Sequence, residues 1–262
     1  MKRTNLMGSM VLFILICSCY QSSGQTNRFG LRLGISVPDL SNTEENIYSK
    51  DFSSRLVGEF ALQYEAPFNN RLSFVTELAF TNRSGKRDAI QPIPSERLPS
   101  LLSQFLAPGT VLFGNFNNVT SQTFLELPLM LKYATGKAEA NWRFYFQGGP
   151  HLAYMIYAEA NTSGSSGLFL DESGSQQLQL PPPIPPLGDV SYAGNFDTSG
   201  SLNRFNYGFH AGFGISRELS NSSHLVFDVR ASRSLRALQK DSTFGATKVG
   251  GLVFSLGYSS AI

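Results

Sequence analysis

From residue 28 onward the sequence repeats one pattern, in which segments of about ten residues alternate bulky apolar side chains with small or polar ones. Successive side chains of a β-strand point to opposite faces, so a period of two is typical of strands with one apolar and one polar face. Each segment is long enough to cross a bilayer at a tilt, which takes roughly 9–11 residues. Eight segments follow the pattern: Arg28–Val37, Arg55–Glu65, Arg71–Thr81, Thr123–Tyr133, Trp142–Tyr157, Phe205–Ser216, His224–Arg233 and Lys248–Tyr258.

The connections between these segments alternate in length. The short ones are Ala66–Asn70, Ala134–Asn141 and Arg217–Ser223, and the longer ones are Pro38–Ser54, Asn82–Gln122, Ala158–Arg204 and Ser234–Thr247. Bacterial outer-membrane barrels have short periplasmic turns and long extracellular loops. The sequence therefore predicts an all-β fold, an eight-stranded antiparallel up-and-down transmembrane β-barrel in the outer membrane. Its long loops are expected outside the cell and both termini in the periplasm.

The two faces of the segments indicate which solvent each meets. Leu72, Phe74 and Phe80 share one face of the third segment, and Ser73 and Glu77 share the other. A soluble lipocalin-like barrel, the alternative, would bury the bulky face and expose a charged one, but only 15% of the residues are charged. We therefore expect the bulky face to meet lipid and the polar, glycine-rich face to line the lumen.

The predicted lumen face carries charges of both signs. An eight-stranded barrel has little more interior than its own side chains fill, and buried charges require partners. We expect a salt-bridge network that plugs the barrel, and the alternative is a gated or proton-conducting path. The residues concerned are Arg32, Lys132, Arg143 and Arg230, facing Glu59, Glu77, Glu126 and Asp228.

The N-terminal segment is typical of a signal peptide. Lys2 and Arg3 precede the apolar stretch Leu6–Ile16, and small residues end at Gly24. We expect residues 1–24 to be this signal peptide and residues 25–262 to form the barrel domain. The alternative is a lipoprotein with lipid on Cys19. Both cysteines lie before residue 25, so cleavage after Gly24 leaves no disulfide or thiol chemistry.

Charge and motifs exclude several functions. Without Lys2 and Arg3 the 21 basic residues become 19, equal to the 19 acidic residues, which argues against nucleic-acid binding. We identify no catalytic, cofactor-binding or metal-binding residues and predict no enzyme and no cofactor. His151, His210 and Asp228 leave a lipid-modifying enzyme as an alternative, which no Gly-x-Ser-x-Gly motif supports. A narrow porin-like channel is the other alternative.

The two longest connections are the best candidates for function. In 82–122, Leu98–Phe105 is expected to form a short amphipathic helix, and in 158–204 the run Leu180–Leu187 favours polyproline II. We expect a monomer in outer-membrane lipid that binds a protein partner through loops 82–122 and 158–204. The alternative for these loops is a stiff spacer or a disordered loop.

Three stretches together give a family resemblance across residues 28–258. They are Phe124 to Tyr133 (FLELPLMLKY), Gly148-Gly149-Pro150, and Tyr207 to Gly214 (YGFHAGFG). With them the chain resembles the PorT-like outer-membrane β-barrel family of Bacteroidetes. The resemblance implies a small barrel related in shape to OmpA-like and OmpX-like proteins. It also raises a surface or secretion-related role as an expectation, because one member is linked to type IX protein secretion.

Overall fold

The structure is a computed structural model that describes residues 26–42, 46–93, 102, 105–107, 109–137, 140–182, 188–220 and 222–262. The predicted signal peptide, residues 1–24, and the alternative lipidation site at Cys19 lie outside these residues. So do Pro183 to Leu187 of the proline-rich run. Of the expected helix Leu98–Phe105, only Leu102 and Phe105 are described.

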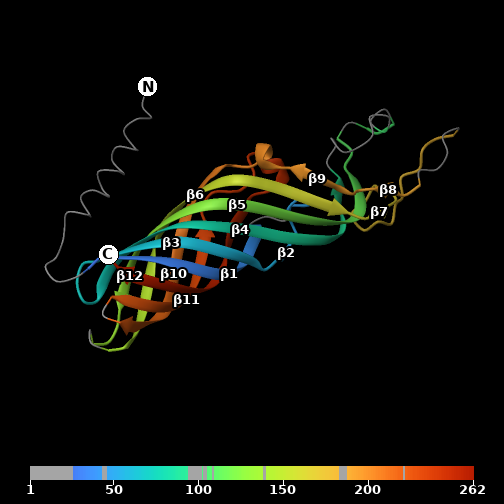
Figure 1. Cartoon of the computed structure of the whole chain (residues 1–262). Helices are drawn as coiled ribbons and strands as arrows, with labels where there is room; N and C mark the ends of the chain where they lie inside the picture. Colours follow the sequence, from blue (N-terminus) through green and yellow to red (C-terminus); the bar gives the residue numbers. More distant parts are fainter. Residues whose placement is uncertain are drawn as a thin grey trace, which may run out of the picture.

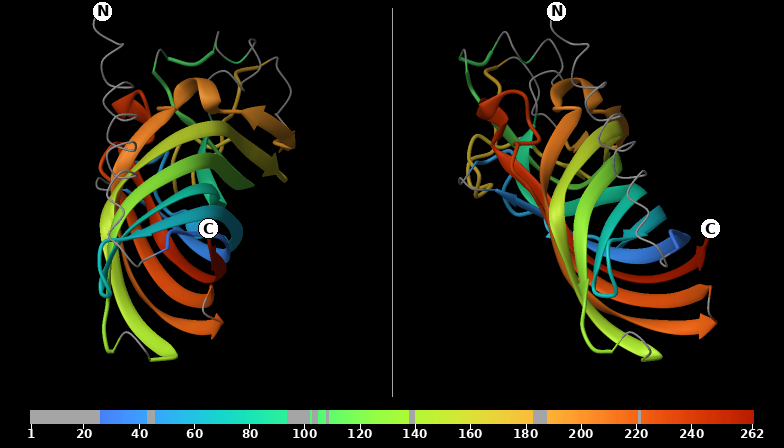
Figure 2. Two further views of the ribbon diagram at one scale, coloured as in Figure 1. Left: turned by 60° about the vertical axis from the view of Figure 1, so that its left-hand side comes forward. Right: turned by 90° about the vertical axis from the view of Figure 1, so that its left-hand side faces the viewer.

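Eight antiparallel strands form a closed ring, which confirms the predicted fold class (Figures 1 and 2). Each strand pairs with its neighbour along the chain, and β12 pairs with β1. The ring strands are β1 (Arg28–Asn42), β3 (Val57–Pro67), β4 (Leu72–Ile93), β5 (Leu112–Ala134), β6 (Trp142–Ser163), β10 (Phe205–Ser220), β11 (Ser223–Ser234) and β12 (Thr247–Ala261).

Short elements lie in the connections. They are β2 (Ser53–Ser54), β7 (Ser165–Ser166), β8 (Val190–Ser191), β9 (Gly194–Asp197) and the 3-10 turns η3 (Ser199–Ser201) and η4 (Ser242–Phe244). In the part of the chain that the structure describes, no helix is long and apolar enough to cross a bilayer.

All short connections lie at the end of the barrel where the first ring strand begins and the last ring strand ends. Arg28 pairs with Ala261 on one side and with Glu65 on the other, so β1 begins where β12 ends (Figure 1). Only residues 68–71, 135–141 and 221–222 separate the strands at this end, which we call the short-turn end. The long connections lie at the opposite end, so the predicted alternation of connection lengths is confirmed.

The prediction of a loop over Asn82–Gln122 is wrong for much of that range. β4 continues to Ile93 and β5 begins at Leu112, and the two strands stay paired from Asn82 with Thr123 out to Ile93 with Leu112. The stretch lacks apolar alternation because polar side chains such as Asn82 and Ser121, which hydrogen-bond to each other, occupy it. Two strands can pair through their backbone hydrogen bonds without an alternation of apolar and polar side chains. The period-two pattern in the sequence therefore did not reveal these strands.

The faces of the ring strands agree with the prediction. Leu33 and Phe144 are each 64% exposed on the outside, and Phe213 is 58% exposed. The alternate residues point inward and are buried, as Arg32 and Glu126 are. A band of exposed aliphatic and aromatic side chains around a charged interior is the arrangement of a lipid-facing barrel.

Beyond the ring, β4, β5 and β6 extend into a separate outer lobe, seen at the right of Figure 1 together with β7, β8 and β9. We define the outer lobe as residues 87–93, 112–119, 160–182 and 188–197. Its small core includes Leu112, Phe116 and Leu168. Tyr192 stacks on Phe116 with ring centroids 4.8 Å apart. The connection 164–204 is therefore packed against the β4–β5 hairpin.

Candidate functional site

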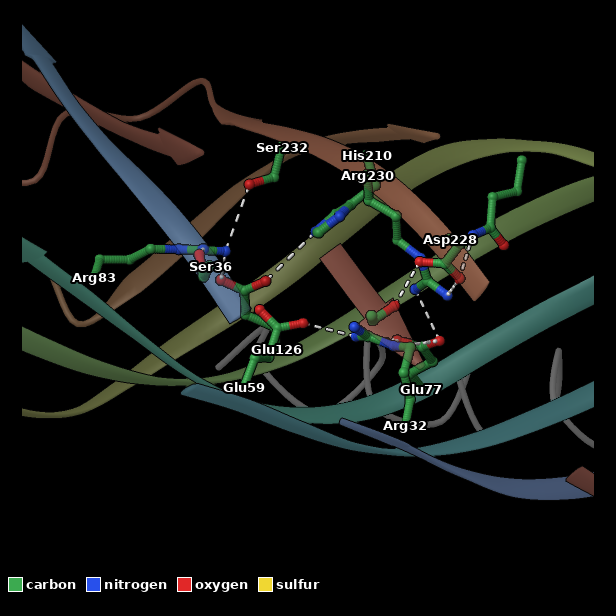
Figure 3. A network of polar contacts seen from close by, with 12 residues as sticks. Arg32, Ser36, Glu59, Glu77, Arg83, Glu126, His210, Asp228, Arg230 and Ser232 are labelled. Carbon is green, nitrogen blue, oxygen red and sulfur yellow. Dashed lines mark hydrogen bonds and ion pairs between the residues drawn. The ribbon is translucent and has the colours of Figure 1, made fainter. Parts of the chain in front are cut away.

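The centre of the lumen is occupied by a network of paired charges (Figure 3). Arg32 on β1 lies 2.7 Å from Glu59 on β3 and 2.8 Å from Glu77 on β4, measured from its Nη2 to the carboxylate oxygens. Nη1 of Arg230 on β11 lies 2.8 Å from the other oxygen of Glu77. Glu77 on β4 therefore joins two guanidinium groups that come from β1 and β11, as expected for buried charges that need partners.

Asp228 completes this network on the far side. Its carboxylate lies 2.7 Å from Nη2 of Arg230 and accepts hydrogen bonds from Tyr145 Oη at 3.0 Å and Ser255 Oγ at 2.6 Å. These contacts come from β6, β11 and β12. Asp228 is thus held by structural partners on three strands.

A second group lies nearer the long loops. Nη2 of Arg83 is 3.2 Å from Glu126, and its Nη1 donates to Ser36 at 2.8 Å. Nε2 of His210 lies 3.4 Å from the other carboxylate oxygen of Glu126, and the ring of His151 contacts that of His210 at 4.5 Å between centroids. The two histidines meet as predicted, but the carboxylate beside them is Glu126 and not Asp228.

Gly208 makes this crowding possible. A Cβ atom at Gly208 would lie 2.7 Å from Cε1 of His151 and 2.1 Å from the backbone oxygen of Arg233. No other residue fits there without moving a strand. The inward-facing glycine at this position therefore leaves room for His151 in the narrow lumen.

Two members of the charged interior differ from the prediction. Arg83 had been assigned to a loop, and its sequence surroundings give no alternation that would have revealed it. Arg143 had been assigned to the lumen ion pairs, but it lies at the short-turn end, where its Nη2 donates to the backbone oxygen of Asn70. It is the second residue of β6 and so lies level with the turns. Lys132 pairs instead with Glu65, at 2.9 Å.

At the long-loop end, an apolar cluster covers the charged network. We call it the apolar cap, and it comprises Phe124, Ala153, Met155, Ala158, Leu202, Leu238 and Val249, with Leu40 packed against it. Leu202 and Leu238 come from the connections 164–204 and 235–246. The side chain of Asn203 ties these connections together by donating to the backbone oxygens of Ala237 at 3.1 Å and Gln239 at 2.9 Å. Sequence reasoning missed the cap because both leucines are isolated in polar segments.

The interior is thus built for structure: paired ions below and an apolar layer above. Within the described residues, no group of three or more His, Cys, Asp or Glu side chains is placed to hold a metal ion. The described part of the lumen holds its carboxylates against arginine, lysine and histidine. What the arrangement does chemically is to fill and rigidify the barrel.

Comparisons with known proteins agree with this architecture. A family model described as "Outer membrane protein beta-barrel domain" matches residues 20–239. No curated protein sequence matches the chain. Among solved structures, the Escherichia coli outer membrane protein W is 14% identical with a TM-score of 0.42, covering 91% of this chain and 100% of its own.

Two further structures are similar at the same level. Neisserial surface protein A is 10% identical with a TM-score of 0.38, covering 89% of this chain and 97% of its own. The Escherichia coli outer membrane protease OmpT is 10% identical with a TM-score of 0.34, covering 94% of this chain and 100% of its own.

Proposed function

Because the chain belongs to the outer membrane protein beta-barrel domain family, we propose that it is a sealed outer-membrane barrel that binds a protein partner through its outer lobe. The observation that carries the proposal is the filled interior. The charged network occupies the middle of the lumen, and the apolar cap covers it. A barrel whose interior is filled in this way offers solutes no path, so its function lies in the surfaces it displays.

The outer lobe supports a binding role because specific contacts attach it to the first long connection. Lys50 forms an ion pair with Glu172, which connects the first long connection to the third. Nη1 of Arg87 donates to the backbone oxygen of Ile47 at 2.7 Å. A surface ordered before binding loses less conformational entropy when a partner docks. The lobe contains parts of both predicted partner loops, 82–122 and 158–204.

In the orientation we propose, the outer lobe is extracellular and both termini are periplasmic. Short turns face the periplasm in bacterial barrels of this kind, and both ends of the ring lie with the short turns. A PorT-like membership, resting on the motifs described above, would place the protein in a surface or secretion-related role. We propose that it acts there as a monomer without enzymatic activity.

The contacts of Asp228 support the non-enzymatic proposal. A Ser/His/Asp hydrolase needs an aspartate that orients its histidine. Asp228 instead accepts from Arg230, Tyr145 and Ser255.

A narrow proton-conducting channel is the second candidate, favoured by one observation. The buried Nδ1 atoms of His151 and His210 have no hydrogen-bond partner among the described residues, beside the charged pair of Arg83 and Glu126. The apolar cap above them argues for the sealed barrel, and conductance measurements separate the two candidates.

Crosslinking in intact outer membranes tests the binding proposal. We compare the wild type with a variant in which residues 165–192 are replaced by a short Gly-Ser linker, and with Lys137→Ser at the opposite end as the matched control. Heat-modifiable migration on gels verifies that each barrel folds. We expect one defined species to be crosslinked to the wild type and to the control, and not to the variant that lacks the lobe. The same species should bind the purified wild-type protein directly. Retention of that species by the lobe variant would contradict the proposal.

A further inference from the structure

A polar cavity opens at the short-turn end of the barrel, below the charged network. Its volume is about 270 Å³. Four basic side chains line it, together with two carboxylates and one histidine: Arg28, Arg71, Lys132, Arg143, Glu65, Glu218 and His224. With a neutral histidine, the lining therefore carries an excess of positive charge.

The ion pairs at this mouth leave its arginines without a directly paired carboxylate, although Glu65 and Glu218 line the same cavity. Lys132 takes Glu65. Among the described residues, no carboxylate lies within ion-pair distance of Arg28, Arg71 or Arg143. Nη2 of Arg143 donates to the backbone oxygen of Asn70. The buried Nε atoms of Arg28 and Arg143 have no acceptor among the described residues.

This contrasts with the network above, where Arg32, Arg83 and Arg230 are each paired with a carboxylate. Burying a donor without an acceptor costs free energy, and more so for a charged group. In the centre of the lumen each of these three arginines has a carboxylate partner, although Nη1 of Arg32 has no acceptor there, whereas the three arginines at the mouth have no carboxylate within ion-pair distance. The Nε donors of Arg28 and Arg143 at the mouth are therefore available to a ligand.

We propose that this cavity binds a multivalent oxyanion, a phosphate or a polycarboxylate. A guanidinium group presents its N–H donors in a planar fork that matches the oxygens of phosphate and carboxylate groups. Three such groups line one polar cavity and supply the charge, and the buried Nε atoms of Arg28 and Arg143 supply donors that lack acceptors. The site lies at the end opposite the outer lobe, so it does not depend on partner binding there.

Calorimetric titration of the folded barrel in neutral-detergent micelles tests the proposal, with inorganic phosphate and citrate as probes. Arg28→Gln and Arg71→Gln should each weaken binding about tenfold or more, since a hydrogen bond between two charged groups is stronger than one from a neutral amide. Arg217→Gln is the matched control. Arg217 is exposed at the same end of the barrel but lies over the ring of Trp142, 5.1 Å from its centroid, and does not line the cavity. Its substitution should leave affinity unchanged.

Two results would overturn the site: no saturable binding of either probe to the wild type, or equal weakening by Arg217→Gln. Heat-modifiable migration confirms that each variant is folded. The source of the anion is determined by competition with short-chain phosphatidylglycerol, with phosphatidylcholine as the zwitterionic comparison. Displacement of phosphate by phosphatidylglycerol alone supports a site for a lipid headgroup, and no displacement by either lipid supports a site for a soluble anion.

Discussion

Arg83 and Glu126 form an ion pair at 3.2 Å inside the barrel, and both side chains are almost fully buried. They come from the neighbouring strands β4 and β5, where Arg83 lies directly opposite Gln122. The pair joins the part of β5 that apolar alternation predicts to the part of β4 that it does not. The charged interior therefore extends above the stretch in which one face is bulky and apolar.

Replacing one member of this pair should be more damaging than replacing both. Arg83→Met leaves Glu126 buried without its guanidinium, which typically costs about 3–5 kcal/mol. The double variant Arg83→Met/Glu126→Met replaces the pair by apolar groups and should recover most of that loss. Urea unfolding in lipid vesicles measures both. A double variant less stable than Arg83→Met alone would contradict this account of the pair.

Glu77 should be the most sensitive carboxylate of the network, because it is bound by both Arg32 and Arg230. Glu77→Gln leaves two buried guanidinium groups short of one negative charge, so we expect a loss of about 3–5 kcal/mol in the free energy of unfolding. Glu172→Gln, which removes the exposed partner of Lys50, is the control and should leave the unfolding midpoint unchanged. Equal effects of the two substitutions would be inconsistent with a structural network.

A charged side chain placed on the outward face at the level of the bilayer should lower the stability of the barrel. Leu33 lies midway along the first predicted segment and is opposite Leu256 and Phe60. Leu33→Arg should destabilise the barrel by about 2–4 kcal/mol in vesicles, the cost of arginine near the bilayer midplane. Leu170→Arg places the same side chain on an exposed position of the outer lobe and should be neutral. A neutral Leu33→Arg would show that this face does not meet lipid.

The apolar cap should open locally when its contacts are weakened. Leu202→Ala removes a buried side chain from the cap, a change that typically costs about 2–5 kcal/mol. Hydrogen exchange should then quicken in residues 198–204 and 236–240, including the amide of Leu238 that donates to Thr247, while the ring strands stay protected. Leu235→Ala, at an exposed leucine nearby, should change nothing. Unchanged exchange in Leu202→Ala would mean that the cap is not held by these contacts.

The sequence was sufficient for the parts of the fold that the bilayer dictates. Lipid requires one apolar face, so residues such as Leu33 and Phe144 reveal the strands, their direction and their inward partners. Arg32, Glu59, Glu77 and the two lumen histidines could be placed for the same reason. Alternation is a property of the membrane-spanning part only, which is why the prediction was reliable there.

Outside the bilayer that constraint is absent. Just beyond the predicted segments, where Asn82 to Asp88 pairs with Asn117 to Thr123, β4 and β5 carry mostly polar residues and are held by backbone hydrogen bonds, so this stretch resembles a loop in sequence. Leu202 and Leu238 meet in the cap through long-range contacts that no local period records. Arg143 was misplaced because inward orientation alone does not tell how deep a residue lies in the barrel.

The central claim, that the barrel interior is sealed by paired charges and the apolar cap, is tested most directly by single-channel recording of the wild type in planar bilayers. We predict no conductance steps at neutral pH or under a proton gradient. Reproducible steps from the folded wild-type protein would contradict the claim and favour the channel instead.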